Sequence, residues 1–284
     1  MQSGWQPAAD VDTLVARARL TNQIRQFFID RDVIEVHTPV LGRCTVTDPD
    51  IESIQVPGYG YLQTSPEYFL KRLLVAGMPS CYQLGSVFRH GELGRQHNAE
   101  FLMLEWYRLG YDHRQLMQEV ADLVNTIMGP APVQTISYAE VVGLDRPDDR
   151  RLLDLPRDQL DLAFAEGCAA LQGRWFVVDY PVDQAVLARV VDGKAARFEM
   201  VLDGVEVANG YWELQGLEEH ARRFGQDQRQ RADRQLATIE PDEAFLAAIH
   251  HGLPDCAGVA VGVDRLMMLA LGQSSLDGVM TFRI

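Results

Sequence analysis

Pairs of strand-like segments that follow one another closely constrain the fold of this chain more than any other feature. Residues 80–89 and 100–108 are strand-like and joined by a polar loop, and Asp203-Gly204 separates two further alternating runs. An Asp-Gly pair between such runs is the strongest short-range signal of a two-residue β-hairpin. The β-α-β alternation of a parallel sheet is missing. The sequence therefore predicts an α+β fold in which helices flank an antiparallel sheet.

Helices are expected between and after these strands. Residues 11–31 carry apolar side chains at helical spacing, and Asp10 or Asp12 could cap their start. A second helix should open at Ser65-Pro66-Glu67, with Ser65 as N-cap and Pro66 at the first helical position. Residues 129–174 break the pattern, and only short helices are plausible there. We interpret that stretch as a short insertion or subdomain on a single domain spanning residues 1–284.

Charge and cysteine content exclude several classes of protein. The chain has 26 Lys and Arg against 40 Asp and Glu, a net charge of −14, which works against non-specific binding of a polyanion. Its four cysteines form no C-x-x-C pair, which argues against a zinc site or a disulfide framework. The first ten residues lack a basic stretch followed by an apolar run, and no apolar run reaches about 18 residues, so we expect no secretory leader. We expect a cytoplasmic protein with reduced thiols and no membrane span.

Carboxylates stand where a strand should bury its side chains. Alternation along 100–108 places Glu105 on one face with Phe101, Met103 and Tyr107. A buried carboxylate requires a cationic partner, which could be an Arg of the core or a substrate.

The hairpin at 203–204 raises the same question. It sets Val201 opposite Glu206 and puts Arg197, Glu199 and Ala208 on the same face. With Glu213, these carboxylates could hold Mg²⁺ or receive a substrate ammonium, or they could form a plain solvated face. Arg89 and Arg265 could clamp a polyphosphate or form surface salt bridges.

Three segments connect these observations. Phe27-Phe28 with Val36-His37-Thr38-Pro39 resembles motif 1 of class II aminoacyl-tRNA synthetases, the element of their dimer interface. Phe88-Arg89 continuing through His97-Asn98 to Glu105-Trp106-Tyr107 resembles motif 2, and Gly262-Val263-Asp264-Arg265 with the following helix resembles motif 3. Glu206-Val207-Ala208-Asn209-Gly210 and Glu213-Leu214 are similar to the lysyl-specific segment. No anticodon-binding barrel is expected before the catalytic domain, so we expect no recognition of a tRNA anticodon.

Within this class, the chain resembles the elongation factor P–(R)-β-lysine ligases, free-standing paralogues of lysyl-tRNA synthetase. The similarity rests on residues 64–68, 94–95, 103–107 and 254–256. Ser65 stands where lysyl enzymes usually carry Ala, and Ala260 where they usually carry Gly. Both differences would reshape the amino-acid pocket, in line with a β-amino substrate.

The resemblance implies an ATP-dependent, AMP-forming ligase that needs Mg²⁺ and forms a homodimer. It would activate (R)-β-lysine as an acyl-adenylate and transfer it to a lysine of elongation factor P. The implied catalytic residues are Arg89 and Arg265. The implied ATP-binding residues are Arg89, His90, Gly91, Asn98, Glu206, Val207, Gly262 and Arg265. The implied substrate-binding residues are Ser65, Pro66, Glu67, Glu105, Tyr107, Asn209, Glu213 and Ala260. The implied metal ligands are Glu206 and Glu213.

Motif 2 departs from its usual pattern at one position. It normally reads Phe-Arg-x-Glu, whereas this chain has Gly91 at the fourth place and Glu92 one place later. A ligase that uses lysine on another acceptor is an alternative. A catalytically impaired paralogue that binds an amino acid as a regulator is another, and Gly91 is the only feature that favours it.

Overall fold

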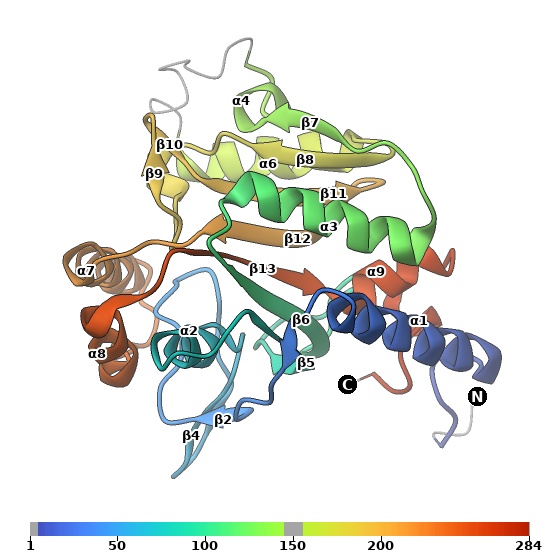
Figure 1. The fold of residues 1–284 in the computed structure, drawn as a ribbon, viewed down its shortest axis with the longest axis horizontal. Coiled ribbons are helices and arrows are strands. Elements are labelled where there is room, and N and C mark those ends of the chain that lie inside the picture. The colour runs from blue at the N-terminus through green and yellow to red at the C-terminus, as the bar shows by residue number, and fades with distance from the viewer. Residues whose placement is uncertain (1–4, 145–155, 284) are drawn as a thin grey trace. The chain divides into compact units, whose positions relative to one another are not determined.

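The computed structural model describes residues 5–144 and 156–283 and divides into two compact units (Figure 1). Unit 1 consists of Met1–Tyr107, Gln215–Pro254 and Gly262–Ile284, and unit 2 of Arg108–Leu214 and Asp255–Val261. The single domain over 1–284 and the insertion at 129–174 stay predictions, and residues 145–155 of that insertion lie outside the described part.

Unit 1 contains a small mixed sheet and most of the helices. Strand β1 (Ile34–Glu35) runs parallel to β5 (Cys81–Phe88), which is antiparallel to β6 (Glu100–Leu109). A second sheet has the order β2 (Leu41–Gly42), β4 (Gly60–Leu62), β3 (Gln55–Val56). The helices are α1 (Val11–Ile29), α2 (Glu67–Val75), α7 (Leu217–Asp233), α8 (Glu243–Gly252), α9 (Val263–Ala270) and the 3₁₀ turn η2 (Leu276–Gly278).

Aromatic side chains fix two of these helices on their neighbours. Helix α1 begins as predicted, because the Asp10 carboxylate accepts from the Thr13 amide at 2.8 Å. At its other end, Phe28 stacks on Tyr82 of β5 with ring centroids 4.3 Å apart. Tyr68 of α2 stacks on Phe245 of α8 at 4.1 Å. Burial of such rings, rather than local propensity, sets where these helices pack.

Unit 2 is a sheet with helices on it. Its strands follow the order β13 (Cys256–Gly262), β12 (Val205–Trp212), β11 (Arg197–Leu202), β8 (Arg174–Val178), β7 (Gln134–Ser137). In Figure 1, α3 (His113–Met128) passes in front of β11 and β12, and α6 (Arg157–Ala170) lies behind β8. The remaining elements are α4 (Tyr138–Val141), η1 (Val182–Gln184), β9 (Val190–Val191) and β10 (Lys194–Ala195).

The hairpin between β11 and β12 contains a bulge that alternation does not predict. Leu202 pairs with Val205 and Val201 with Glu206, as expected, but the next pair is Met200 with Ala208. Val207 is therefore the extra residue. Beyond it, Ala208 shares a face with Met200, so its predicted place beside Glu199 is wrong. Asn209 takes that place, because it pairs with Glu199.

Three other expectations need correction. The sheet is not wholly antiparallel, because β1–β5 and β7–β8 are parallel pairs. Helix α6 has 14 residues, although only short helices seemed plausible in that stretch. Its few apolar positions gave a weak signal, and it is held by packing of Leu160 and Cys168 into a cluster around Tyr138. Finally, α2 has Pro66 rather than Ser65 at its N-cap.

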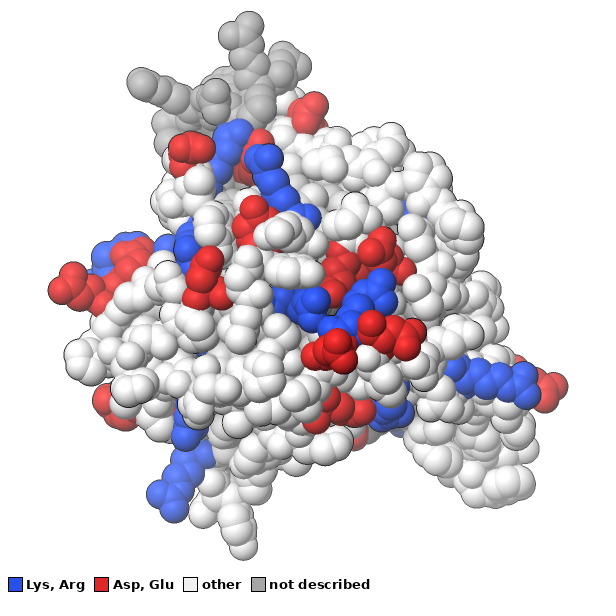
Figure 2. Space-filling model, in the orientation of Figure 1, with Lys and Arg blue, Asp and Glu red and all other residues white. Residues whose placement is uncertain are grey.

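Acidic and basic side chains alternate over the surface that Figure 2 shows, so the excess of carboxylates is not gathered into one uniform patch on that face. Among the described residues, no helix is long and apolar enough to cross a membrane.

Candidate active site

A buried carboxyl group forms the centre of one group of candidate residues in unit 1. Glu105 of β6 is 3% exposed. Its two oxygens accept from the Ser65 hydroxyl at 2.7 Å and from the Tyr107 hydroxyl at 2.8 Å. Strand alternation places Glu105 and Tyr107 on one face, as predicted, and the start of α2 brings Ser65 to them. Both donors are hydroxyls, so an ion pair with an Arg of the core, one of the two alternatives considered, is not what holds this carboxyl.

A buried ion pair lies next to this carboxyl. Lys71 of α2 is 0% exposed and donates to Glu67, one helical turn before it, at 2.5 Å. Pro66 is the N-cap residue of the same helix, and Glu67 is the first residue of that helix. Lys71 therefore neutralises a carboxylate that the resemblance implies binds the substrate.

The pKa of Glu105 is raised to about 8, first by its burial and then by the negative charge of Glu67. The Ser65 and Tyr107 hydroxyls and the Lys71 ammonium act in the opposite direction. The carboxyl thus holds a proton at neutral pH in the absence of a ligand. A substrate ammonium in this pocket would favour its ionised form.

A neutral histidine borders the same pocket. His220 of α7 is buried, and its Nδ1 lies 2.9 Å from the Gly216 carbonyl, which can only accept. Burial lowers the pKa of His220 to about 4, and the nearby Lys71 ammonium acts in the same direction. The imidazole therefore adds no positive charge beside Lys71 at neutral pH.

Arg89 follows β5 and is the candidate anion-binding group. Its guanidinium lies over the Phe101 ring, 5.2 Å from the centroid. One Nη is 3.5 Å from the Glu92 carboxylate, while the buried Nε has no hydrogen-bond partner among the described residues. Gly91 has φ +75, a left-handed conformation that turns the chain between the two. Glu92, one place after Gly91, thereby reaches Arg89.

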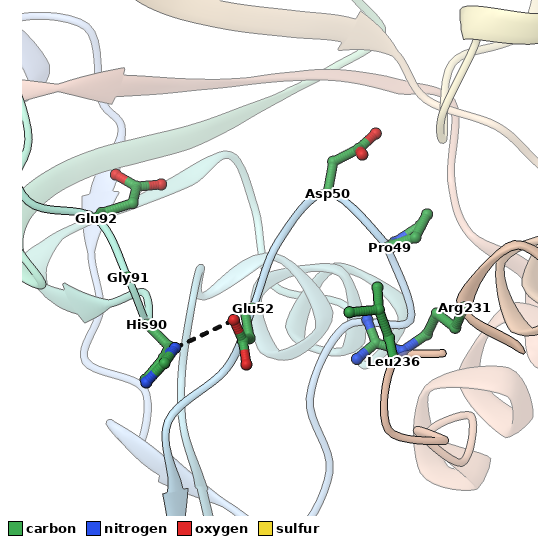
Figure 3. A pocket seen from close by; sticks show the side chains of 8 residues that line it. All are labelled: Pro49, Asp50, Glu52, His90, Gly91, Glu92, Arg231 and Leu236. Carbon is green, nitrogen blue, oxygen red and sulfur yellow. Dashed lines mark ion pairs between the residues drawn. The ribbon is translucent and has the colours of Figure 1, made fainter. Parts of the chain in front are cut away.

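The same turn borders a hollow of about 270 Å³ (Figure 3). His90 there pairs with Glu52 at 3.1 Å. Arg231 is buried on another side, and it donates to the carbonyls of Asp48 and Ala237. The hollow is lined by Pro49, Asp50, Glu52, His90, Gly91, Glu92, Arg231 and Leu236.

The remaining motif 2 and motif 3 residues of unit 1 meet at the tip of the β5–β6 loop. Arg265 of α9 donates to the Gln96 carbonyl at 3.1 Å, and its Nη2 lies 2.7 Å from His97 Nε2. Since a guanidinium only donates, His97 accepts through that nitrogen. Asn98 is buried, and its amide donates to the Glu100 carbonyl at 2.7 Å. Gly262 is the N-cap residue of α9.

Unit 2 carries a separate group of candidate residues on β11 and β12. Arg197 donates to Glu199 at 2.5 Å and to the Asn209 side chain at 3.3 Å. Its guanidinium also lies 4.3 Å from the centroid of the Tyr180 ring. The pKa of Glu199 is raised to about 7 by burial and then by the charge of Glu206, against the effect of Arg197.

The candidate residues of unit 2 differ in exposure. Glu206 is exposed beside the bulge, whereas Val207 and Glu213 are buried. Ala260 of β13 pairs with Asn209 of β12, so both belong to one cross-strand position. The bulge brings Glu206 and Asn209, three residues apart, to the same face of the sheet.

The predicted residues thus gather within each unit. Unit 1 brings together Ser65, Glu67, Glu105 and Tyr107, and separately the tip of the motif 2 loop with Arg265. Sequence reasoning missed Lys71 and His220. The spacing of four between Glu67 and Lys71 was a usable signal, whereas no local pattern announces His220, which lies 149 positions after Lys71 in the chain.

Comparison with known proteins defines the class first. The family model for class II tRNA synthetases (D, K and N) matches residues 9–283. The chain is 41% identical to a protein of Photorhabdus laumondii and 40% identical to one of Vibrio atlanticus. Both alignments extend over 318 residues, 99% of this chain and 98% of the relative. A protein of Salmonella paratyphi B is 40% identical over 316 residues, 99% of this chain and 97% of that protein.

All three relatives are named elongation factor P–(R)-β-lysine ligase. The chain belongs to the class II tRNA synthetase family and, within it, to the group of these ligases. An alignment of 318 positions is longer than the 284 residues of this chain, so the relatives contain residues that have no counterpart here.

Proposed function

We propose that this protein is an ATP-dependent ligase that activates (R)-β-lysine and attaches it to a lysine side chain of elongation factor P. The relatives' shared name supports the substrate and the acceptor. The observation that carries the proposal is the pocket of Glu105, Tyr107 and Ser65, a protonated carboxyl with two hydroxyls and a nearby ion pair. Such a pocket suits the distant ammonium of a diamino acid, which would displace the proton.

The reaction has two balanced steps. A carboxylate oxygen of the amino acid attacks the α-phosphorus of ATP, and pyrophosphate leaves. The acceptor amine then attacks the carbonyl carbon of the adenylate, AMP leaves, and the amine loses a proton to solvent. We infer that Arg89 holds the carboxylate and α-phosphate, since its buried Nε has an unused donor. Arg265, together with Asn98, holds the rest of ATP. Positioning and charge stabilisation then carry the catalysis.

The residues present fit Mg²⁺ held mainly by the substrate. The described residues include no ready group of three His, Cys, Asp or Glu side chains. Protein sites for Mg²⁺ with ATP use one or two carboxylates and complete the shell with phosphates and water. The exposed Glu206 could supply one carboxylate, and Glu213 the other. When bound, Mg²⁺ would offset part of the phosphate charge.

We further propose that the protein works as a homodimer in the cytoplasm. Helix α1 and the residues after it expose large apolar side chains, notably Val11 at 67% and Ile29 at 62%. Exposed apolar faces of this kind mark association surfaces. All four cysteines are free, as expected of a reducing compartment.

The intact mass of elongation factor P tests the function directly. The factor from the same organism is incubated with this protein, ATP, Mg²⁺ and (R)-β-lysine, with α-lysine in a parallel reaction. We expect a mass increase of one lysyl unit, larger in yield with the β-isomer. If neither isomer changes the mass while ATP–pyrophosphate exchange is measurable, the acceptor is wrong. If exchange is also missing, the ligase proposal fails.

A further inference from the structure

Arg283 contacts the tip of the β5–β6 loop more closely than the loop contacts itself. The tip is closed by two backbone hydrogen bonds between Gly94 and His97, 3.2 and 3.3 Å long. These lie at or beyond the long end of the usual N–H···O range. One Nη of Arg283 donates to the same two carbonyl oxygens at 2.7 and 2.8 Å. Hydrogen bonds from a charged donor are also the stronger kind.

The guanidinium of Arg283 is itself held in place. Its other Nη pairs with the Asp277 carboxylate at 3.0 Å, and its Nε lies 3.5 Å from the Asn98 side-chain oxygen. The Arg283 side chain is 19% exposed. Because the guanidinium is planar and one of its nitrogens is held by Asp277, its remaining donors point in one fixed direction. A lysine ammonium on a flexible chain would not be oriented in this way.

The rest of the segment 274–283 grips the same loop. Arg95, at the loop tip, donates to the Ser274 carbonyl at 2.9 Å, and the Leu276 amide donates back to the Arg95 carbonyl at 2.9 Å. Leu276 is buried and anchors the segment in unit 1. The tip thus lies between two arginines, Arg265 and Arg283, from two different segments.

We propose that Arg283 is a positioning residue for the ATP site. By fixing the carbonyls of Gly94 and His97, it sets the path of the loop that carries His97 and Asn98, and thereby the place of Arg265, which bonds to the same tip. This inference rests on the proposed use of Asn98 and Arg265 to bind ATP. Arg283 itself touches the loop, not the reacting atoms.

The test compares four variants by two independent measurements. Arg283→Met removes the hydrogen-bond donors and keeps the apolar part of the side chain. Arg283→Lys keeps the positive charge but lacks the planar guanidinium. Asp277→Asn removes the carboxylate that pairs with Arg283. Arg157→Met is the control, since Arg157 forms a similar partly exposed ion pair with Asp161, at 2.8 Å, on α6. Amide hydrogen exchange follows residues 94–98 without any substrate. ATP–pyrophosphate exchange gives KM for ATP and for the amino acid.

For Arg283→Met we expect amide hydrogen exchange at residues 94–98 to be about ten times faster than in the wild type. KM for ATP should be about ten times higher, and KM for the amino acid should stay within about twofold. Arg283→Lys and Asp277→Asn should fall between this variant and the wild type, and Arg157→Met should match the wild type.

If amide hydrogen exchange at residues 94–98 is unchanged in Arg283→Met, then Arg283 does not hold the loop in place. If amide hydrogen exchange at the loop is faster but KM for ATP is unaltered, then Arg283 holds the loop without positioning the ATP site. If the wild-type protein shows no ATP–pyrophosphate exchange, the proposed function is refuted instead. The comparison of amide hydrogen exchange would still decide whether Arg283 holds the loop in place.

Discussion

The proton on Glu105 makes substrate binding and stability depend on pH in opposite directions. The pKa of this carboxyl is about 8 in the folded chain, against a usual value of 4.5, because of burial and the charge of Glu67. Between these two pH values the unfolded chain releases the proton and the folded chain keeps it. The free energy of unfolding therefore falls as pH rises through this range, by at most about 1.4 kcal/mol per pH unit.

Binding of a cationic substrate should show the opposite trend. An ammonium beside Glu105 favours its ionised form, so binding releases a proton, and KM for the diamino acid should fall as pH rises from about 6 to 8. The expected slope is at most about tenfold per pH unit. Steady-state ATP–pyrophosphate exchange across this range measures it. Glu105→Gln should bind poorly with no such slope, and Glu166→Gln, an exposed carboxylate of α6, should behave as the wild type. The same slope in Glu105→Gln would assign the proton to another group.

Contacts between site residues were predictable from periodicity only where the residues are close in the sequence. Glu105 and Tyr107 are two apart on a strand, so period-two alternation placed them together. Ser65 reaches Glu105 from 40 positions away; the resemblance gave both residues as substrate-binding but predicted no contact between them. His220 and Arg283 belong to the site region through tertiary packing alone. No local periodicity encodes such contacts.

At the scale of elements, the hairpin of β11 and β12 shows how far patterning reaches. The Asp203-Gly204 turn and its first two pairs were predicted, because the turn type fixes the register next to it. The bulge at Val207 was not, since one extra residue leaves no signature in a run of alternating side chains. It nevertheless decides that Asn209, rather than Ala208, faces Glu199.

Gly210, the one glycine of β12, follows this bulge and should not tolerate a larger side chain. A Cβ there would come within 2.4 Å of the Phe198 ring and 3.0 Å of the Val259 side chain. We expect Gly210→Ala to lower the free energy of unfolding by about 1–3 kcal/mol through overpacking. Urea denaturation followed by circular dichroism measures the change.

The matched control for Gly210→Ala is Gly225→Ala, within helix α7. A Cβ at Gly225 would meet no atom within 4 Å, so this change should raise the free energy of unfolding by about 0.5–1 kcal/mol through helix propensity. Equal effects of the two substitutions would show that Gly210 is not sterically required.

At the scale of the whole molecule, the sequence indicated the class of fold but not its division into two units. Both units are discontinuous, and unit 1 is assembled from three separate stretches of chain. Periodicity describes neighbours along the chain, whereas such a division depends on contacts between distant segments. The three motifs indicated the family because each is itself a local pattern, and the family match extends over residues 9–283.

The assembly of the molecule provides the last prediction. Ile29 of α1 and Leu162 of α6 are equally exposed, at 62% and 61%, but only Ile29 lies in the apolar run that includes Val11 and Ile34. A carboxylate buried in an association surface is left without a partner, at a cost of several kcal/mol. Ile29→Glu should therefore shift sedimentation velocity from dimer to monomer at micromolar concentration. Leu162→Glu should leave a dimer, because a single exposed apolar residue needs no partner. A wild type that sediments as a monomer would refute the dimer. Dissociation by Leu162→Glu alone would place the interface elsewhere.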